Sequence, residues 1–201
     1  MISLVDYGMG NVRSVLNAFE SIGTEARLVS DPDAVVRSER IVVPGVGAFG
    51  DAMSVLRERG LAQALRDAAA AGRTILGICL GMQLLASRST EFGEHEGLDL
   101  IPGSVDYLAT DSTLRIPHVG WNDLAVRRAD PILADLGPEP TFYFVHSFEY
   151  HPSDPEAVTA VTDYGRDVTA CVGSGRVFGV QFHPEKSGDD GLTLLRTFVT
   201  C

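Results

Sequence analysis

The sequence predicts an α/β protein with an open, mostly parallel sheet that is flanked by helices and extended by antiparallel strands. In the first half, short apolar runs alternate with segments of helical periodicity, as in parallel sheets whose strands are joined by helical crossovers. In the second half, runs of β-branched and aromatic residues follow one another directly, which is typical of antiparallel strands. We expect residues 1–201 to form a single domain with a sizeable core.

The first half of the chain contains four expected strands. They are residues 2–5, 26–29, 41–43 and 74–78. A helix is expected at 11–22, and residues 51–59 and 61–71 are expected to form one or two helices. The apolar residues of the first helix follow helical spacing: Val12, Val15, Leu16, Phe19 and Ile22. Asn11 has a side chain suited to cap that helix, and Gly23 and Gly72 are expected to end their helices.

The second half contains six expected strands and one helix. The strands are residues 105–108, 119–126, 142–149, 157–162, 168–172 and 177–182, and the helix is 189–199. Ser174-Gly175 predicts a hairpin turn between the last two strands. Leu192, Leu195, Phe198 and Val199 share one face of the final helix, which we expect to pack on the sheet.

The composition narrows the classes of function. Hydrophobic residues make up 45% and charged residues 21%, which indicates a globular rather than a disordered chain. The net charge of -11 argues against a nucleic-acid surface, which needs clustered Lys and Arg. No apolar run reaches the length of a membrane-spanning helix, and the three widely spaced cysteines provide no disulfide framework. We therefore expect a cytoplasmic protein, without a metal site because no His or Cys pair has ligand spacing.

Cys79 lies in the motif Gly77-Ile-Cys79-Leu-Gly81, where an apolar strand is expected to turn into a helix. This pattern is the thiol version of a nucleophile elbow, in which small flanking residues leave one side chain exposed at the carboxyl end of a strand. The dipole of the following helix favours the thiolate. An isolated cysteine is more often a small buried hydrophobe, which is our interpretation of Cys171.

His183-Pro184-Glu185 follows the last expected strand. In an extended chain the imidazole and the carboxylate share a face, so Glu185 can accept the hydrogen of the far ring nitrogen. Oxyanion donors are available from the backbone of Leu80 and from the glycine-rich turn at residues 44–47. Together the motifs predict an enzyme that forms a covalent acyl intermediate.

The remaining histidines and one glycine pair are weaker signals. His95 and His151 are expected at the surface, whereas the sequence leaves the roles of His118 and His146 open. Gly8-x-Gly10 follows the first strand as in a dinucleotide fingerprint. Because the third glycine is missing, we interpret it as a turn.

The motif around Cys79 and the motif His183-Pro184-Glu185 together resemble those of the class I (triad) glutamine amidotransferases. Four further segments resemble, more narrowly, the glutaminase subunits of imidazole glycerol phosphate synthases: residues 6–14, 44–49, 117–122 and 143–147. They occur in the family's order along nearly the whole chain. The resemblance implies a flavodoxin-like fold and the hydrolysis of glutamine to glutamate and ammonia.

The resemblance also implies a role for individual residues and a partner. Cys79 would form a glutamyl thioester, His183 would transfer the protons, and Glu185 would hold the imidazole. The oxyanion hole would involve Val46, Gly47 and Leu80, the glutamine site Gly45, Gln83, Ser147 and Phe148, and the partner interface Asn11, Trp121 and Lys186. The partner would be a (β/α)₈-barrel cyclase that uses the ammonia to make imidazole glycerol phosphate and an aminoimidazole carboxamide ribotide. No metal or organic cofactor is implied.

Two departures and two alternatives accompany this hypothesis. Phe148 stands where the family commonly has Tyr, and the segment 91–96 is acidic for a loop near an interface. A glutaminase domain of another synthase would use the same triad, but residues 7–11 and 117–122 favour the histidine pathway. A catalytically idle module, a chaperone or a peptidase is a different class; an idle module would be expected to have lost part of the triad.

Overall fold

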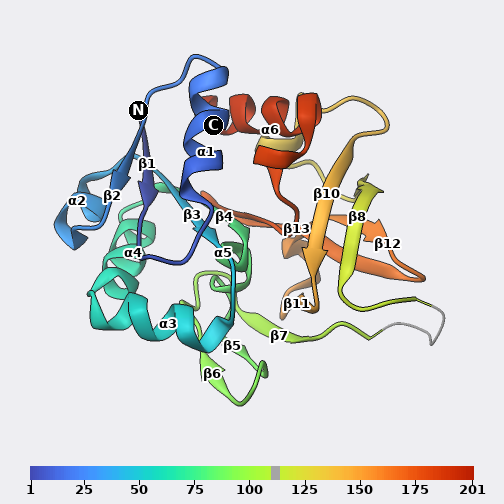
Figure 1. The fold of residues 1–201 in the computed structure, drawn as a ribbon, viewed down its shortest axis with the longest axis horizontal. Helices are drawn as coiled ribbons and strands as arrows, with labels where there is room; N and C mark the ends of the chain where they lie inside the picture. The colour runs from blue at the N-terminus through green and yellow to red at the C-terminus, as the bar shows by residue number, and fades with distance from the viewer. Residues whose placement is uncertain (110–113) are drawn as a thin grey trace.

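The computed structural model describes residues 1–109 and 114–201, and a central eight-stranded sheet runs through it (Figure 1). Its strand order is β2-β1-β3-β4-β14-β13-β12-β9. The parallel part consists of β1 (Ile2–Val5), β2 (Ala26–Val29), β3 (Arg40–Gly45), β4 (Thr74–Cys79) and β14 (Val177–Val180). Antiparallel β13 (Asp167–Ser174), β12 (Val158–Asp163) and β9 (Ala125–Val126) extend it, which confirms the predicted fold class.

Helices cover both faces of the parallel strands because successive side chains point to opposite faces. One face packs against α1 (Val12–Ser21) and α6 (Gly188–Thr200), and the other against α2 (Pro32–Arg37), α3 (Phe49–Glu58) and α4 (Leu61–Ala70). In β3, Val42 joins the core beneath α1 and α6, whereas Ile41 and Val43 join the core beneath the other three helices. The sheet is therefore the middle layer of three.

Two small sheets accompany the central one, and Phe142 and Phe144 of the first pack in the core that the central sheet shares with α1 and α6. One pairs β8 (His118–Asp123) with β10 (Thr141–His146), and the other has the order β11-β7-β5-β6. The strands of the second sheet are β5 (Arg88–Ser89), β6 (His95–Glu96), β7 (Gly103–Tyr107) and β11 (Phe148–Pro152). Short helical turns complete the fold: α5 (Leu80–Gln83), η1 (Pro131–Leu133), η2 (Pro155–Ala157) and η3 (Pro184–Lys186). Open parallel sheets place their sites beyond the carboxyl ends of the strands, and residues of both small sheets line the pocket that opens there, at the end of β4.

Several predicted boundaries are wrong. The strand expected at 142–149 breaks at Ser147, where the chain passes from the β8–β10 sheet into the sheet of β11. The strand expected at 119–126 breaks at Leu124, and the one expected at 177–182 ends at Val180. Asn11 occupies the N-cap position of α1, but its side chain makes no capping hydrogen bond. Within the described residues, no helix has the length and apolar character needed to cross a membrane.

Candidate active site

Cys79 is the last residue of β4 and immediately precedes α5, with a φ of 55° that non-glycine residues rarely adopt. The flanking glycines make this turn possible. A Cβ on Gly81 would lie 1.8 Å from the carbonyl oxygen of Val43, and one on Gly77 would lie 2.4 Å from the carbonyl oxygen of Gly81. The expectation of an exposed thiol is wrong, because Cys79 is only 7% exposed and reaches solvent through a pocket.

His183 and Glu185 come together in the turn η3, where the His183 Nδ1–H donates to Glu185 Oε1 over 2.8 Å. The expected extended geometry is wrong, since Pro184 begins a 3₁₀ turn. Both side chains are at least 98% buried. The backbone of His183 is fixed as well. Its N–H donates to the carbonyl of Tyr143, and its carbonyl accepts from the Ser187 hydroxyl.

The charge of His183 depends on its two neighbours. Burial lowers the pKa of His183, but the close approach of the Cys79 and Glu185 side chains raises it by more, to about 9. Its Nε2 atom is buried and makes no hydrogen bond of good geometry within the described part of the chain. Because Nδ1 is committed to Glu185, Nε2 is the nitrogen that is free to exchange a proton with a bound substrate.

Backbone N–H groups without acceptors among the described residues lie in the loop after β3 and at the start of α5, and their residues line the same pocket as Cys79. The loop after β3 turns at Gly47 with a φ of 101°, and neither Val46 nor Gly47 donates a backbone hydrogen bond to any residue that the structure describes. Leu80 is the first residue of α5, so its N–H has no intrahelical acceptor. The Tyr7 hydroxyl holds the start of the loop by donating to the Pro44 carbonyl over 2.9 Å.

A pocket of about 560 Å³ opens above Cys79. Its lining includes the expected residues Val46, Gly47, Leu80, Gln83, Ser147, Phe148 and His183. Gln83 Nε2 donates to the Phe148 carbonyl over 3.3 Å and to Gln181 Oε1 over 3.0 Å. Gly45 lies outside the pocket wall and is packed tightly, because a Cβ there would be 2.7 Å from the Tyr7 hydroxyl.

Glu91 and Phe92 also line the pocket, and the sequence does not predict them there. Glu91 is 9% exposed, and its Oε2 accepts the Phe49 N–H over 2.6 Å. Phe92 follows with a φ of 55° and is 87% exposed at the pocket mouth. The acidic character of segment 91–96 is the only feature of the sequence that points to these residues. The adjoining strands β5 and β6 have two residues each, which is too short to show a periodic pattern.

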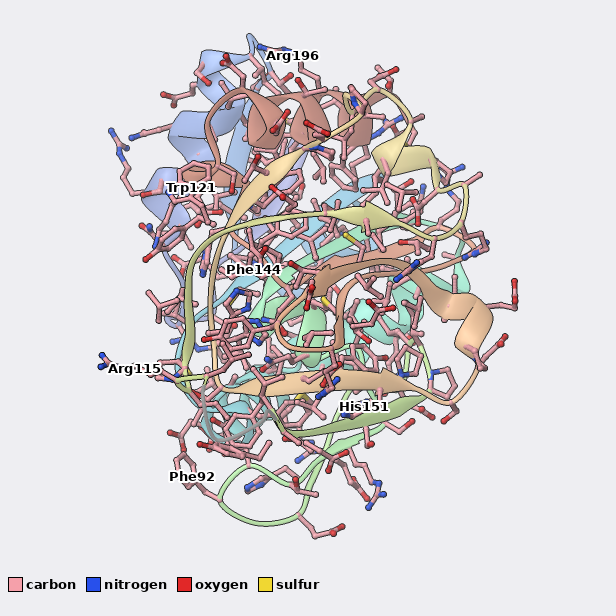
Figure 2. The ribbon with its side chains drawn as sticks, turned by 90° about the vertical axis from the view of Figure 1, so that its right-hand side faces the viewer. Phe92, Arg115, Trp121, Phe144, His151 and Arg196 are labelled. Carbon is pink, nitrogen blue, oxygen red and sulfur yellow. The ribbon has the colours of Figure 1, made fainter. Side chains whose placement is uncertain are left out.

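The residues expected at a partner interface lie at the surface beside Tyr143. Trp121 is 58% exposed, its ring centroid is 6.2 Å from that of Tyr143, and Lys186 Nζ is 6.0 Å from the same ring. Asn11 directly precedes α1, which contacts the turn that carries Lys186. Figure 2 shows Trp121 and Phe92 along the same margin of the molecule, with Phe144 further inside.

The comparison with protein families decides the classification. The family model of the class-I glutamine amidotransferases matches residues 3–200. The chain belongs to this family. It is 44% identical to an imidazole glycerol phosphate synthase subunit HisH from Syntrophotalea carbinolica, with 98% of both chains covered. It is 47% identical to the subunit of that name from Sulfurimonas denitrificans, with 98% of this chain and 97% of the relative covered.

Solved structures agree on the fold. A crystal structure of a glutamine amidotransferase superposes with a TM-score of 0.79 at 22% identity, covering 100% of this chain and 98% of that one. A chain of PurLQS from Thermotoga maritima superposes with a TM-score of 0.77 at 25% identity, covering 99% and 97%. The fold of the class I glutamine amidotransferases is therefore the fold of this chain. Among the described residues, no three His, Cys, Asp or Glu side chains are grouped to hold a metal ion.

Proposed function

We propose that this chain is the glutaminase subunit of an imidazole glycerol phosphate synthase. One observation carries the chemistry: the buried His183–Glu185 pair lies beside Cys79 at the floor of a pocket lined by free backbone donors. The names of relatives that are 44–47% identical along the whole chain support the synthase. Retention of Cys79, His183 and Glu185 argues against an idle module.

The proposed reaction begins when the sulfur of Cys79 attacks the side-chain amide carbon of glutamine. The N–H groups of Val46, Gly47 and Leu80 are the candidate donors to the oxyanion of the tetrahedral intermediate. The protonated His183 gives its Nε2 proton to the amide nitrogen. The bond between that nitrogen and the carbon then breaks, so that ammonia leaves and the acyl group remains on Cys79 as a glutamyl thioester. Neutral His183 then takes a proton from water, which hydrolyses the thioester to glutamate and restores Cys79.

The pocket wall supplies groups for the rest of the substrate. Gln83, Ser147 and Phe148 present an amide, a hydroxyl and backbone groups near the thiol. Glu91 is the carboxylate among the lining residues, and we assign it to the α-ammonium group of glutamine. Gly45 acts indirectly in this proposal, by allowing the loop to pack against Tyr7 and Leu80.

The proposed partner is a (β/α)₈-barrel cyclase that receives the ammonia and converts a ribulosyl formimino carboxamide ribotide. Large apolar side chains are exposed beside the site: Val46, Phe92, Tyr107, Val119 and Trp121. Exposed apolar side chains that lie together on a protein surface are typical of a docking face. Asn11 and Lys186 belong to the same proposed interface. The three cysteines are free thiols, which supports our assignment to the cytoplasm.

The experiment is an ammonia-release assay with glutamine, run on the subunit alone and after co-purification with the barrel cyclase. We expect glutamine-dependent formation of imidazole glycerol phosphate in the complex. A complex that uses only added ammonium salts would contradict the glutaminase assignment. Hydrolysis of glutamine without any stable association with the cyclase would contradict the synthase assignment alone.

A further inference from the structure

Two buried histidines face each other at the pocket, where His146 is part of the lining and His118 lies beside it. His118 on β8 and His146 on β10 are 2% and 5% exposed. They are opposite one another in the antiparallel pair, and His118 Nδ1 lies 3.1 Å from His146 Nε2. The reaction proposed above assigns no task to either residue.

The hydrogen bond between His146 and the Phe148 carbonyl fixes the tautomers of both histidines. His146 Nδ1 is 2.9 Å from the backbone carbonyl of Phe148, and a carbonyl can only accept, so Nδ1 carries the hydrogen. In a neutral His146, Nε2 is then bare and must accept from His118. The hydrogen of His118 is therefore also on Nδ1, and its own Nε2 is an acceptor.

The contact of His118 with Asn122 indicates the same tautomer of His118. Asn122 Nδ2 donates to the Asp163 carbonyl over 2.7 Å, and Asn122 Oδ1 accepts the Asp123 N–H. This fixes the orientation of the amide, whose Nδ2 lies 3.4 Å from His118 Nε2. An amino group can only donate, so His118 Nε2 must accept. All donors thus point from Asn122 through both rings to the Phe148 carbonyl.

The surroundings keep both rings uncharged. The ring of His118 is stacked between those of Phe144 and Tyr164, at centroid distances of 4.9 and 4.0 Å. Burial, and then the proximity of His146, lowers the pKa of His118 to about 4. Burial lowers the pKa of His146 too, against the opposing influence of the Phe148 carbonyl and Glu149, and His183 lowers it further.

The carbonyl at the end of the pair belongs to the corner that walls the glutamine site. Ser147 and Phe148 connect β10 to β11 and line the pocket, and the same carbonyl accepts from Gln83 Nε2. We propose that His118 and His146 are positioning residues, which hold the Ser147–Phe148 corner and the Gln83 amide in the geometry that binds glutamine. This inference rests on the proposed glutaminase function.

Substitution at His146 separates positioning from general stability. His146→Leu removes the donor, and His146→Asn retains one, because the Asn Nδ2 atom stands where Nδ1 of the imidazole was. In the complex with the cyclase, we expect His146→Leu to raise the KM for glutamine about tenfold, the value of one lost hydrogen bond, with kcat changed far less. His146→Asn should restore KM to within about threefold of the wild type.

Two further variants address the second ring and the specificity of the effect. His118→Phe keeps the stack with Phe144 and Tyr164 but removes the donor to His146, so we expect KM to rise here as well. His151→Ala is the matched control, because this histidine lies on β11 with a side chain that is 46% exposed. Its KM should equal that of the wild type. An unchanged KM in His118→Phe, or a His146→Asn as impaired as His146→Leu, would overturn the proposal.

The tautomers can be measured without any assay of activity. Long-range ¹H–¹⁵N spectra of the wild-type chain should show His118 and His146 as neutral Nδ1–H imidazoles at pH 7, and the His146→Asn spectrum should assign the signals. An Nε2–H form or a charged ring at either position would overturn the relay. If the spectra agree but the wild-type complex hydrolyses no glutamine, the proposed function fails while the hydrogen-bonded pair stands.

Discussion

His183 is charged at neutral pH in this site, and the charge determines how the reaction should respond to pH. Its pKa is raised from 6.5 to about 9, so the imidazolium persists through neutral pH and is lost as the pH rises through about 9. Because the departing ammonia takes its proton from this ring, we expect kcat/KM for glutamine to fall above about pH 9. Glu185→Gln removes one of the two groups that raise this pKa, so the alkaline limb should move to lower pH. A limb that stays in place or moves upward would contradict the assignment.

The roles of His183 and Glu185 predict which substitution reduces kcat more. His183→Ala removes the proton carrier and should reduce kcat by about 10⁶, whereas Glu185→Gln removes only its orientation and should cost about 10⁴. Single-turnover measurements of thioester formation in the complex would give both values. A fully active Glu185→Gln variant would exclude Glu185 from catalysis. If the two variants lost the same factor in kcat, Glu185 would do more than orient His183.

At the residue scale, the sequence predicts those contacts that depend on near neighbours in the chain. Cys79 between two glycines and His183 two residues before Glu185 are such cases, although the 3₁₀ turn at Pro184 was not foreseen. Glu91 and the His118–His146 pair were not predicted. Their environments arise from segments far apart in the chain, and no local pattern encodes that approach.

The elements around Cys79 are packed so closely that one methyl group should disturb them. A Cβ at Gly45 would lie 2.7 Å from the Tyr7 hydroxyl and 2.9 Å from both the Gly81 nitrogen and the Leu80 Cβ. Gly45→Ala should therefore lower the free energy of unfolding by about 1–3 kcal/mol. It should also displace an oxyanion donor and reduce glutaminase kcat by about 10²–10³.

Urea unfolding and the glutaminase assay measure these two effects. Gly137→Ala is the control, since a Cβ at Gly137 would have no atom within 4 Å. Both quantities should remain at the wild-type values in that variant. A Gly45→Ala protein with wild-type stability and activity would show that this packing does not hold the loop.

At the element scale, strong periodicity was predictive and short elements were not. The parallel strands and the helices α1, α3, α4 and α6 were predicted because their apolar patterns are regular. The helix α2 was missed, although Asp31 accepts from the Asp33 N–H and Pro32 is at the first position, which are start signals for a helix. The break at Ser147 depends on tertiary pairing with β7, so the apolar run 142–149 reads as one strand.

At the scale of the whole molecule, the apolar side chains beside the pocket predict where a partner binds. Trp121→Ala should weaken association with the cyclase by about 2 kcal/mol or more, as expected when a tryptophan is removed from an interface. Leu28→Ala is the control, because Leu28 is 44% exposed on β2. That strand is at one edge of the central sheet, and β9, which directly follows the strand of Trp121, is at the other edge. Titration calorimetry with the isolated cyclase would give both affinities. Equal affinities for the two variants would contradict the proposed interface.

The central claim is that Cys79 releases the ammonia that the synthase uses. The most direct measurement is the formation of imidazole glycerol phosphate by the Cys79→Ala complex, first with glutamine and then with ammonium salts as the nitrogen source. Removing a nucleophile of this kind costs about 10⁶ in turnover, so we predict no detectable product with glutamine and a wild-type rate with ammonium. Product formation from glutamine by Cys79→Ala would contradict the account.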